Sequence, residues 1–128
     1  MDLSRRLLLV DKSAWVRGAA VADVEGELCL CAVTRLEILH SARSAADYEA
    51  LDGALALFRD LRMDTDTFAG AHDGQRELAR AGGHRVPLPD LLIAACAQQH
   101  AAGVLHVDRH FELLAGVFAF DAVPLGAG

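Results

Sequence analysis

The chain has 128 residues, of which 53% are hydrophobic and 5% aromatic, and its formal net charge is −6. That length is typical of one domain, so we expect a single domain over residues 1–128. The hydrophobic content excludes intrinsic disorder, and the few aromatic residues argue against a base-stacking surface. The acidic balance excludes nucleic-acid binding driven by bulk charge.

The cysteine pattern and the apolar runs indicate a cellular compartment. No apolar run approaches the roughly 20 residues of a membrane span, and the first residues lack the pattern of a signal peptide. Cys29, Cys31 and Cys96 are odd in number and form no disulfide framework, which is typical of reduced thiols. We therefore expect a cytoplasmic protein that makes no membrane contact.

The first third of the chain predicts a strand followed by a helix. Residues 7–10 are continuously apolar, as in a buried strand, and Asp11 ends the run. Ser13 is expected to cap a helix over residues 14–23. Residues 28–32 are too short to assign from pattern alone.

Two helices are expected next. Thr34-Arg35-Leu36-Glu37 matches a capping box, which predicts a helix from Thr34 to about Ala42. Residues 44–61 carry one apolar stripe at helical spacing, and this stripe belongs either to the core or to a dimer face. Its members are Tyr48, Leu51, Leu55 and Phe58.

The second half of the chain repeats the alternation of helices and strands. The helix patterns are bounded by glycines or prolines, and the strand patterns are short and apolar. The expected elements are a strand at 61–63, a helix at 67–81, an extended segment at 86–89, a helix at 90–102, a strand at 104–107, a helix at 111–115 and a strand at 117–123.

Strands separated by helices imply an α/β fold with a mostly parallel sheet and helices on both faces. In such sheets, ligands bind beyond the carboxyl ends of the strands. Asp11 and Asp108 follow strands directly, and Glu37 and Asp90 lie at helix starts. The topology therefore allows all four acids to meet at one edge of the sheet.

Each of these acids also has an ordinary structural interpretation. Asp11 and Asp108 could begin turns, Glu37 could complete the capping box, and Asp90 could be a favourable first-turn acid. Together, however, carboxylates about 4 Å apart repel by roughly 4 kcal/mol per pair at an effective dielectric of 20. Such a cluster either takes up protons or binds a hard divalent cation such as Mg²⁺.

Four segments of the chain, in order, resemble the motifs of PIN-domain ribonucleases, in particular the VapC toxins of bacterial toxin–antitoxin pairs. The resemblance covers essentially the whole chain, and it implies a PIN-like three-layer fold. The matching segments are Leu-Leu-Val-Asp-Lys-Ser-Ala at 8–14, Thr-Arg-Leu-Glu-Ile-Leu-His-Ser-Ala-Arg at 34–43, Pro-Asp-Leu-Leu-Ile-Ala-Ala at 89–95 and His-Val-Asp-Arg-His-Phe-Glu at 106–112.

The resemblance assigns roles to the acids. It implies that Asp11, Glu37, Asp90 and Asp108 are catalytic and bind Mg²⁺ or Mn²⁺, and that Ser13 orients the site. The implied reaction is the metal-dependent hydrolysis of an RNA phosphodiester. Asp11 and Asp90 are the best candidates for direct ligands, and Glu37 is either a ligand through water or the group that takes the proton of the attacking water.

The chain departs from the family pattern at His110. Members of the family often carry a further acid at this position, two residues after the fourth motif acid. Its absence weakens the case for a second metal ion. Lys12 follows the first acid and either contacts a scissile phosphate or pairs with a carboxylate. A different metal set, formed by His106, Asp108 and His110 along an extended segment, would suit zinc or iron.

Contact with RNA is expected from cations near the acids in sequence. Arginine can bind a phosphate through two donors or stack on a base, although each arginine taken alone is equally explained as a solvated surface residue. The candidate residues are Lys12, Arg17, Arg43, Arg85 and Arg109.

The resemblance implies an endoribonuclease toxin that acts on tRNA or another structured RNA, forms a homodimer and is neutralised by a cognate antitoxin. The first alternative is a PIN-like binding module with little catalysis, which acts through complex formation with the antitoxin. The second is a phosphoryl-transfer domain with Asp11 as nucleophile. It fits poorly, because position 13 is Ser and the only Lys is Lys12.

Overall fold

The computed structural model describes residues 6–19, 24–83 and 85–126. The elements are β1 (Leu7–Val10), α1 (Lys12–Trp15), β2 (Glu27–Leu30), α2 (Ala32–His40), α3 (Ala45–Leu55), β3 (Arg59–Asp60), α4 (Thr65–Arg80), α5 (Leu88–Gln99), β4 (Gly103–His106), α6 (His110–Leu114) and β5 (Ala122–Pro124). Within the described residues, no helix is long and apolar enough to cross a membrane.

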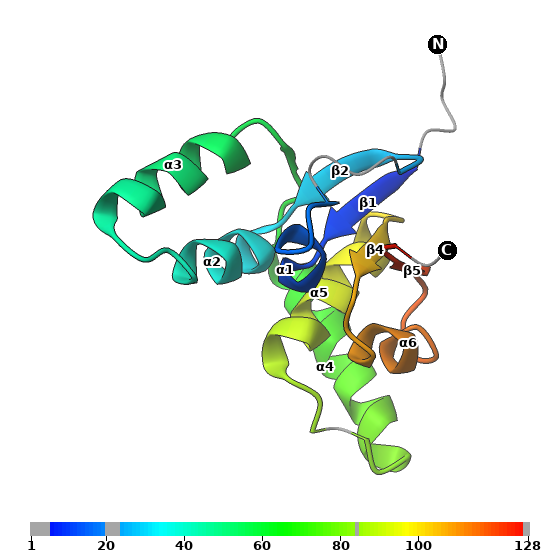
Figure 1. Ribbon diagram of the computed structural model, residues 1–128. Coiled ribbons are helices and arrows are strands. Elements are labelled where there is room, and N and C mark those ends of the chain that lie inside the picture. The colour runs from blue at the N-terminus through cyan, green and yellow to red at the C-terminus, as the bar shows by residue number, and fades with distance from the viewer. Residues whose placement is uncertain (1–5, 20–23, 84, 127–128) are drawn as a thin grey trace.

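The five strands form one parallel sheet in the order β3-β2-β1-β4-β5 (Figure 1). The expected α/β class with a parallel sheet is confirmed. The central strand β1 pairs with β2 on one side and β4 on the other, and Leu9 lies opposite both Cys29 and Val104. The ends of β1 and β4 therefore lie side by side.

The strands bury alternate side chains in two separate cores, as the period of a β-strand requires. Leu9 and Val104 pack against α4, α5 and α6, whereas Leu8, Val10 and Leu105 pack against α1, α2 and α3. Helices thus cover both faces of the sheet, which confirms the three-layer arrangement. In Figure 1, α2 and α3 extend as a pair away from the sheet, and α4 and α5 lie together beside it.

Several expected element boundaries are wrong. α1 ends at Trp15 and is followed by a turn at residues 16–18, and the expected continuation of this helix over residues 20–23 lies outside the described residues. α3 ends at Leu55 instead of near residue 61, because the chain must turn into the short strand β3. Leu55 is fully buried, whereas Tyr48 is exposed, so the apolar stripe contributes to the core at its C-terminal end.

The last strand is also shorter than expected. β5 covers only Ala122–Pro124 and pairs with β4, and residues 117–121 form the turn that leads into it. The three cysteines, in β2, at the start of α2 and in α5, are all buried, and none is in a disulfide. The neighbouring Ala94, Ala95 and Ala97 of α5 are buried as well, so α5 is the central helix of its layer.

Candidate active site

Four acids meet beyond the carboxyl ends of β1 and β4. Carboxylate oxygens of Asp11, Glu37 and Asp90 all lie within 4.8 Å of one another. Oxygens of Asp90 and Asp108 lie within 4.8 Å of each other and of a ring nitrogen of His110. Because Asp90 belongs to both groups, it is the centre of one cluster.

Asp11 and Ser13 connect the two strand ends. Asp11 is buried at the N-cap of α1, and its Oδ2 accepts hydrogen bonds from the Ser13 backbone N–H at 3.0 Å and the Ser13 hydroxyl at 2.5 Å. The Ser13 Oγ in turn accepts from the backbone N–H of Val107 at 2.9 Å. The expectation that Ser13 caps the helix is wrong, because Asp11 takes that position and Ser13 fixes the orientation of Asp11.

Asp90 lies in the first turn of α5, which begins at Leu88 after the extended Pro87. Only 7% of Asp90 is exposed. Burial, reinforced by the nearby Asp11 and Asp108 carboxylates, raises the pKa of Asp90 to about 6, and His110 opposes this rise. The three carboxylates of Asp90, Asp11 and Asp108 therefore lie close enough together that a proton or a cation must balance their negative charge.

Glu37 reaches the cluster from α2. The predicted capping box at Thr34–Glu37 is wrong, because the helix begins two residues earlier and Thr34 Oγ1 accepts the N–H of the N-cap residue Cys31 at 2.9 Å. Helix capping therefore does not explain the presence of Glu37 at this position. Burial and the Asp11 carboxylate raise the pKa of Glu37, whereas Lys12 and His40 lower it.

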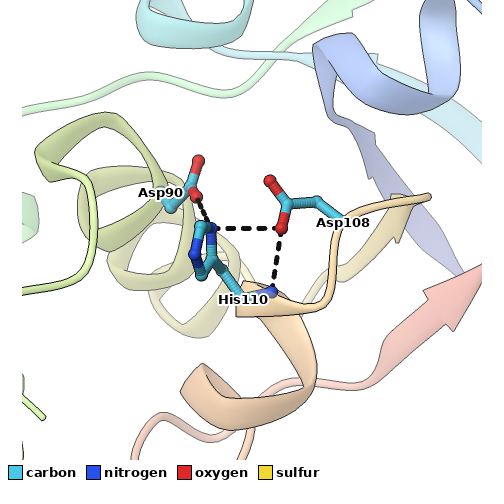
Figure 2. A group of neighbouring side chains, drawn as sticks. All are labelled: Asp90, Asp108 and His110. Carbon is cyan, nitrogen blue, oxygen red and sulfur yellow. Dashed lines mark hydrogen bonds and ion pairs between the residues drawn. The ribbon is translucent and has the colours of Figure 1, made fainter.

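His110 is the feature that sequence reasoning undervalued. Figure 2 shows its imidazole between the carboxylates of Asp90 and Asp108, with Nδ1 3.0 Å from Asp90 Oδ2 and 3.1 Å from Asp108 Oδ1. The same Asp108 oxygen accepts the His110 backbone N–H at 2.9 Å. The signal was present in the sequence, since His110 occupies the position where the family often has a further acid.

His106 does not join this cluster. It is 3% exposed, its ring lies 5.6 Å from that of Phe111, and its Nε2 lies 3.2 Å from an oxygen of Glu112. The alternative metal set of His106, Asp108 and His110 is therefore wrong in composition, because Asp90 takes the place assigned to His106.

Of the basic candidates for RNA contact, all within the described residues, only Lys12 has an interaction with an acid of the cluster, Glu37. Lys12 is half-buried at the start of α1, close enough to Glu37 to lower its pKa. Four arginines are exposed, on the turn after α1, between α2 and α3, before α5 and before α6: Arg17, Arg43, Arg85 and Arg109. Their role in RNA contact stays a prediction.

The donor atoms of the Asp11, Glu37 and Asp90 group fit a hard divalent cation. All of them are carboxylate oxygens, two of the three side chains are buried, and no nitrogen or sulfur ligand belongs to the group. Mg²⁺ and Mn²⁺ prefer such a set and complete their coordination with water.

A parallel sheet covered on both faces, with a carboxylate cluster at the ends of its central strands, is the architecture of a PIN domain. A model of the PIN domain matches residues 8–117, and the chain belongs to this family. The chain is 42% identical over 128 residues to Ribonuclease VapC17 of Mycobacterium tuberculosis, with 94% of this chain and 96% of that protein covered. It is 37% identical over 119 residues to Ribonuclease VapC18 of the same species, with 84% and 87% covered.

Solved structures share the fold. The VapBC-5 structure, a member of the VapBC family of toxin-antitoxin systems from Mycobacterium tuberculosis, superposes with a TM-score of 0.76 at 23% identity, covering 94% of this chain and 99% of that one. The DNA-bound VapBC of Salmonella typhimurium gives a TM-score of 0.75 at 19% identity, covering 94% and 98%. The resemblance to PIN-domain proteins of the VapC type is thereby confirmed.

Proposed function

We propose that this protein is a metal-dependent endoribonuclease toxin that hydrolyses RNA phosphodiester bonds and is neutralised by a cognate antitoxin. The observation that carries the proposal is the meeting of Asp11, Glu37 and Asp90 at the ends of β1 and β4, with Asp108 joined to them through Asp90. Relatives that align with nearly the whole chain are named ribonucleases, which supports the reaction class.

The residues of the site divide the work. Asp11 and Asp90, which are buried, would hold the ion with Glu37, and Ser13 keeps Asp11 in place. A bound Mg²⁺ or Mn²⁺ supplies Lewis acidity, which neutralises the phosphate and makes a water molecule more acidic. Glu37 is the candidate to take the water's proton, because burial and the Asp11 carboxylate raise its pKa and so make it a stronger base than an ordinary glutamate.

The substrate in this proposal is a structured RNA such as tRNA. The chain carries a net charge of −6, so affinity depends on local cations and not on bulk charge. The exposed arginines are the candidates for this contact, above all Arg109, which lies between Asp108 and His110 in the sequence, because a guanidinium can bind a phosphate through two donors.

The partners follow from the same family. We propose a cognate antitoxin that covers the acidic cluster, a homodimer and a cytoplasmic location. Structural neighbours are described as VapBC toxin-antitoxin complexes, which supports an antitoxin partner.

The test compares wild-type protein with Asp90→Asn and with Asp73→Asn, a control on the exposed face of α4. Purified proteins are incubated with total RNA and Mg²⁺ or Mn²⁺, and new RNA ends are mapped. We expect cleavage by the wild type and Asp73→Asn, loss of at least about a hundredfold in rate with Asp90→Asn, and no cleavage with EDTA.

The second part of the test is expression of both proteins in cells. We expect the wild type to arrest growth and to produce new RNA ends, and Asp90→Asn to do neither. Equal arrest by both proteins without new RNA ends would overturn the nuclease and favour the binding module.

A further inference from the structure

A hollow of about 530 Å³ lies where the chain passes from α2 into α3, the pair of helices that extends away from the sheet in Figure 1. Small-molecule sites have volumes of about 300–1,000 Å³, so a nucleobase fits this space. The side chains that line it include Leu39 and His40 of α2, Arg43 of the connection, and Tyr48 and Glu49 of α3. None of these residues belongs to the acidic cluster.

The helix α2 connects the hollow with the acidic cluster. Glu37 and His40 are three residues apart on this helix, which places them on one side of it and about 4.5 Å apart along its axis. Burial raises the pKa of Glu37, and the charge of His40 is near enough to oppose this rise. An RNA chain whose scissile phosphate lies at Glu37 therefore has a neighbouring nucleotide within reach of the hollow.

Tyr48 gives the hollow an aromatic wall. It is the only tyrosine of the chain, and 41% of it is exposed, although it belongs to an apolar stripe whose member Leu55 is fully buried. A partly exposed ring is a stacking surface for an unpaired base, and such stacking does not require a positive net charge. Leu39, which is buried, adds apolar surface to the same hollow. The hollow therefore suits the flat face of a base.

Arg43 supplies a cation. Its backbone N–H donates to Asp47 Oδ2 at 2.9 Å, which fixes the main chain at this point. Within the part of the chain that the structure describes, its guanidinium takes part in no hydrogen bond or ion pair, so it is available to bind a phosphate through two donors. Glu49 offsets the charge of Arg43, and stacking on Tyr48 therefore supplies much of the affinity.

We propose that this hollow is a nucleotide subsite for the RNA substrate, with a base stacked on Tyr48 and a phosphate bound by Arg43. This inference rests on the proposed function, because the RNA must also lie over the acidic cluster. Carboxylates and a metal ion act on the phosphate that is cleaved, and contacts to phosphate carry no sequence information. A base held on Tyr48 fixes the position of the RNA along α2 and so contributes to the choice of the bond that is cleaved.

The first experiment maps where RNA lies on the protein. Asp90→Asn, which is expected not to cleave, is mixed in Mg²⁺ with a random-sequence single-stranded oligoribonucleotide that contains 4-thiouridine. Irradiation crosslinks the RNA to neighbouring side chains, and mass spectrometry identifies the labelled peptides. We expect labels between His40 and Glu49. RNA crosslinked elsewhere on the protein, with this segment unlabelled, would overturn the subsite.

The second experiment measures the cleavage of random-sequence RNA by the wild type, Tyr48→Ala, Tyr48→Phe and Phe68→Ala. Phe68 is a matched control, because it is an aromatic residue of α4 that is 54% exposed. Tyr48→Ala should raise KM about tenfold, change kcat less and weaken the base preference at one position near the cut. Tyr48→Phe keeps the ring and should retain most of the affinity, and Phe68→Ala should match the wild type. Far-ultraviolet circular dichroism checks that each variant is folded.

The results distinguish the subsite from the nuclease itself. Cleavage by Tyr48→Ala with the KM and the base preference of the wild type would overturn the subsite and leave the proposed function intact. Equal losses of affinity in Tyr48→Ala and Tyr48→Phe would contradict stacking and so the subsite. RNA crosslinked to the hollow of a protein whose wild type cleaves no RNA would support the subsite and contradict the proposed function.

Discussion

At the scale of single residues, Asp90 is the acid of the site whose ionised form is most strongly disfavoured by its surroundings. It is buried, faces Asp11 and Asp108, and is balanced in the metal-free protein only in part by His110. The ionised form of a residue in this environment contributes little to the stability of the fold, which makes Asp90 a candidate for a functional role.

This environment predicts a dependence of stability on pH. The pKa of Asp90 is about 6 in the folded protein and 3.8 for an ordinary aspartate, so the folded state binds the proton more tightly. The free energy of unfolding contributed by this group is therefore greatest at low pH and falls as the pH rises from about 4 through 6. We expect a loss of about 1 kcal/mol after allowing for solvent screening and for His110.

The measurement is urea unfolding in EDTA between about pH 4.5 and 7.5, with Asp90→Asn as the comparison. Because the amide cannot ionise, the stability of Asp90→Asn relative to the wild type should increase over this interval. The exposed Asp73→Asn should follow the wild type. Parallel curves for Asp90→Asn and wild type would contradict the raised pKa.

At the scale of elements, the sequence predicted the two central strands and the motifs better than the helix ends and the outer strands, since β3 lies at Arg59–Asp60 instead of 61–63 and β5 covers only Ala122–Pro124. The strands β1 and β4 were found because buried parallel strands are continuously apolar. The start of α2 was misplaced because Thr34 was taken as the N-cap residue, whereas it is the third residue of the helix. From there its hydroxyl accepts the backbone N–H of the true N-cap residue, Cys31. Cysteine has no capping preference, so the pattern did not indicate it. Asp11 and Ser13 are both good caps, and pattern alone does not choose between them.

The four acids of the candidate site were predicted from the sequence, whereas the contact of His110 with them was not. Residues remote in sequence were grouped because the strand-end rule and the family motifs both pointed to the same four acids. The contact between His110 and Asp90 was not foreseen, since it depends on how the loop after β4 turns into α6. Hydrophobic periodicity carries no information on such a turn.

The contact between α4 and Phe118 predicts that two glycines of this helix differ in their tolerance of substitution. α4 contains Gly70 and Gly74, one turn apart. A Cβ on Gly74 would overlap the ring of Phe118, which is buried, whereas a Cβ on Gly70 would meet nothing within 4 Å. Gly74→Ala should therefore destabilise the protein by about 1–3 kcal/mol, since the buried Phe118 ring must shift to make room for the added Cβ.

Gly70→Ala is the matched control in the same helix. Without a steric conflict, it should stabilise the protein by up to about 1 kcal/mol through helix propensity. Chemical denaturation of both variants provides the measurement. Equal effects of the two substitutions would show that α4 does not pack on Phe118 as described.

At the scale of the whole molecule, the acidic cluster joins layers that lie on opposite faces of the sheet. Glu37 comes from α2, which packs with Leu8, Val10 and Leu105, whereas Asp90 comes from α5, which packs with Leu9 and Val104. Asp11 lies between them at the end of β1. A cation held by these three residues therefore connects the two halves of the fold.

Unfolding of the molecule should in consequence be linked to metal binding. An ion that binds only the folded state stabilises it by about 2.7 kcal/mol at one hundred times its dissociation constant. We expect Mn²⁺ or Mg²⁺ to raise the midpoint of thermal unfolding relative to EDTA at equal ionic strength. Asp90→Asn should lose this increase and Asp73→Asn should keep it, because only Asp90 belongs to the cluster. An increase of the same size in Asp90→Asn would mean that the ion binds elsewhere and that the two layers are held together by their apolar cores alone.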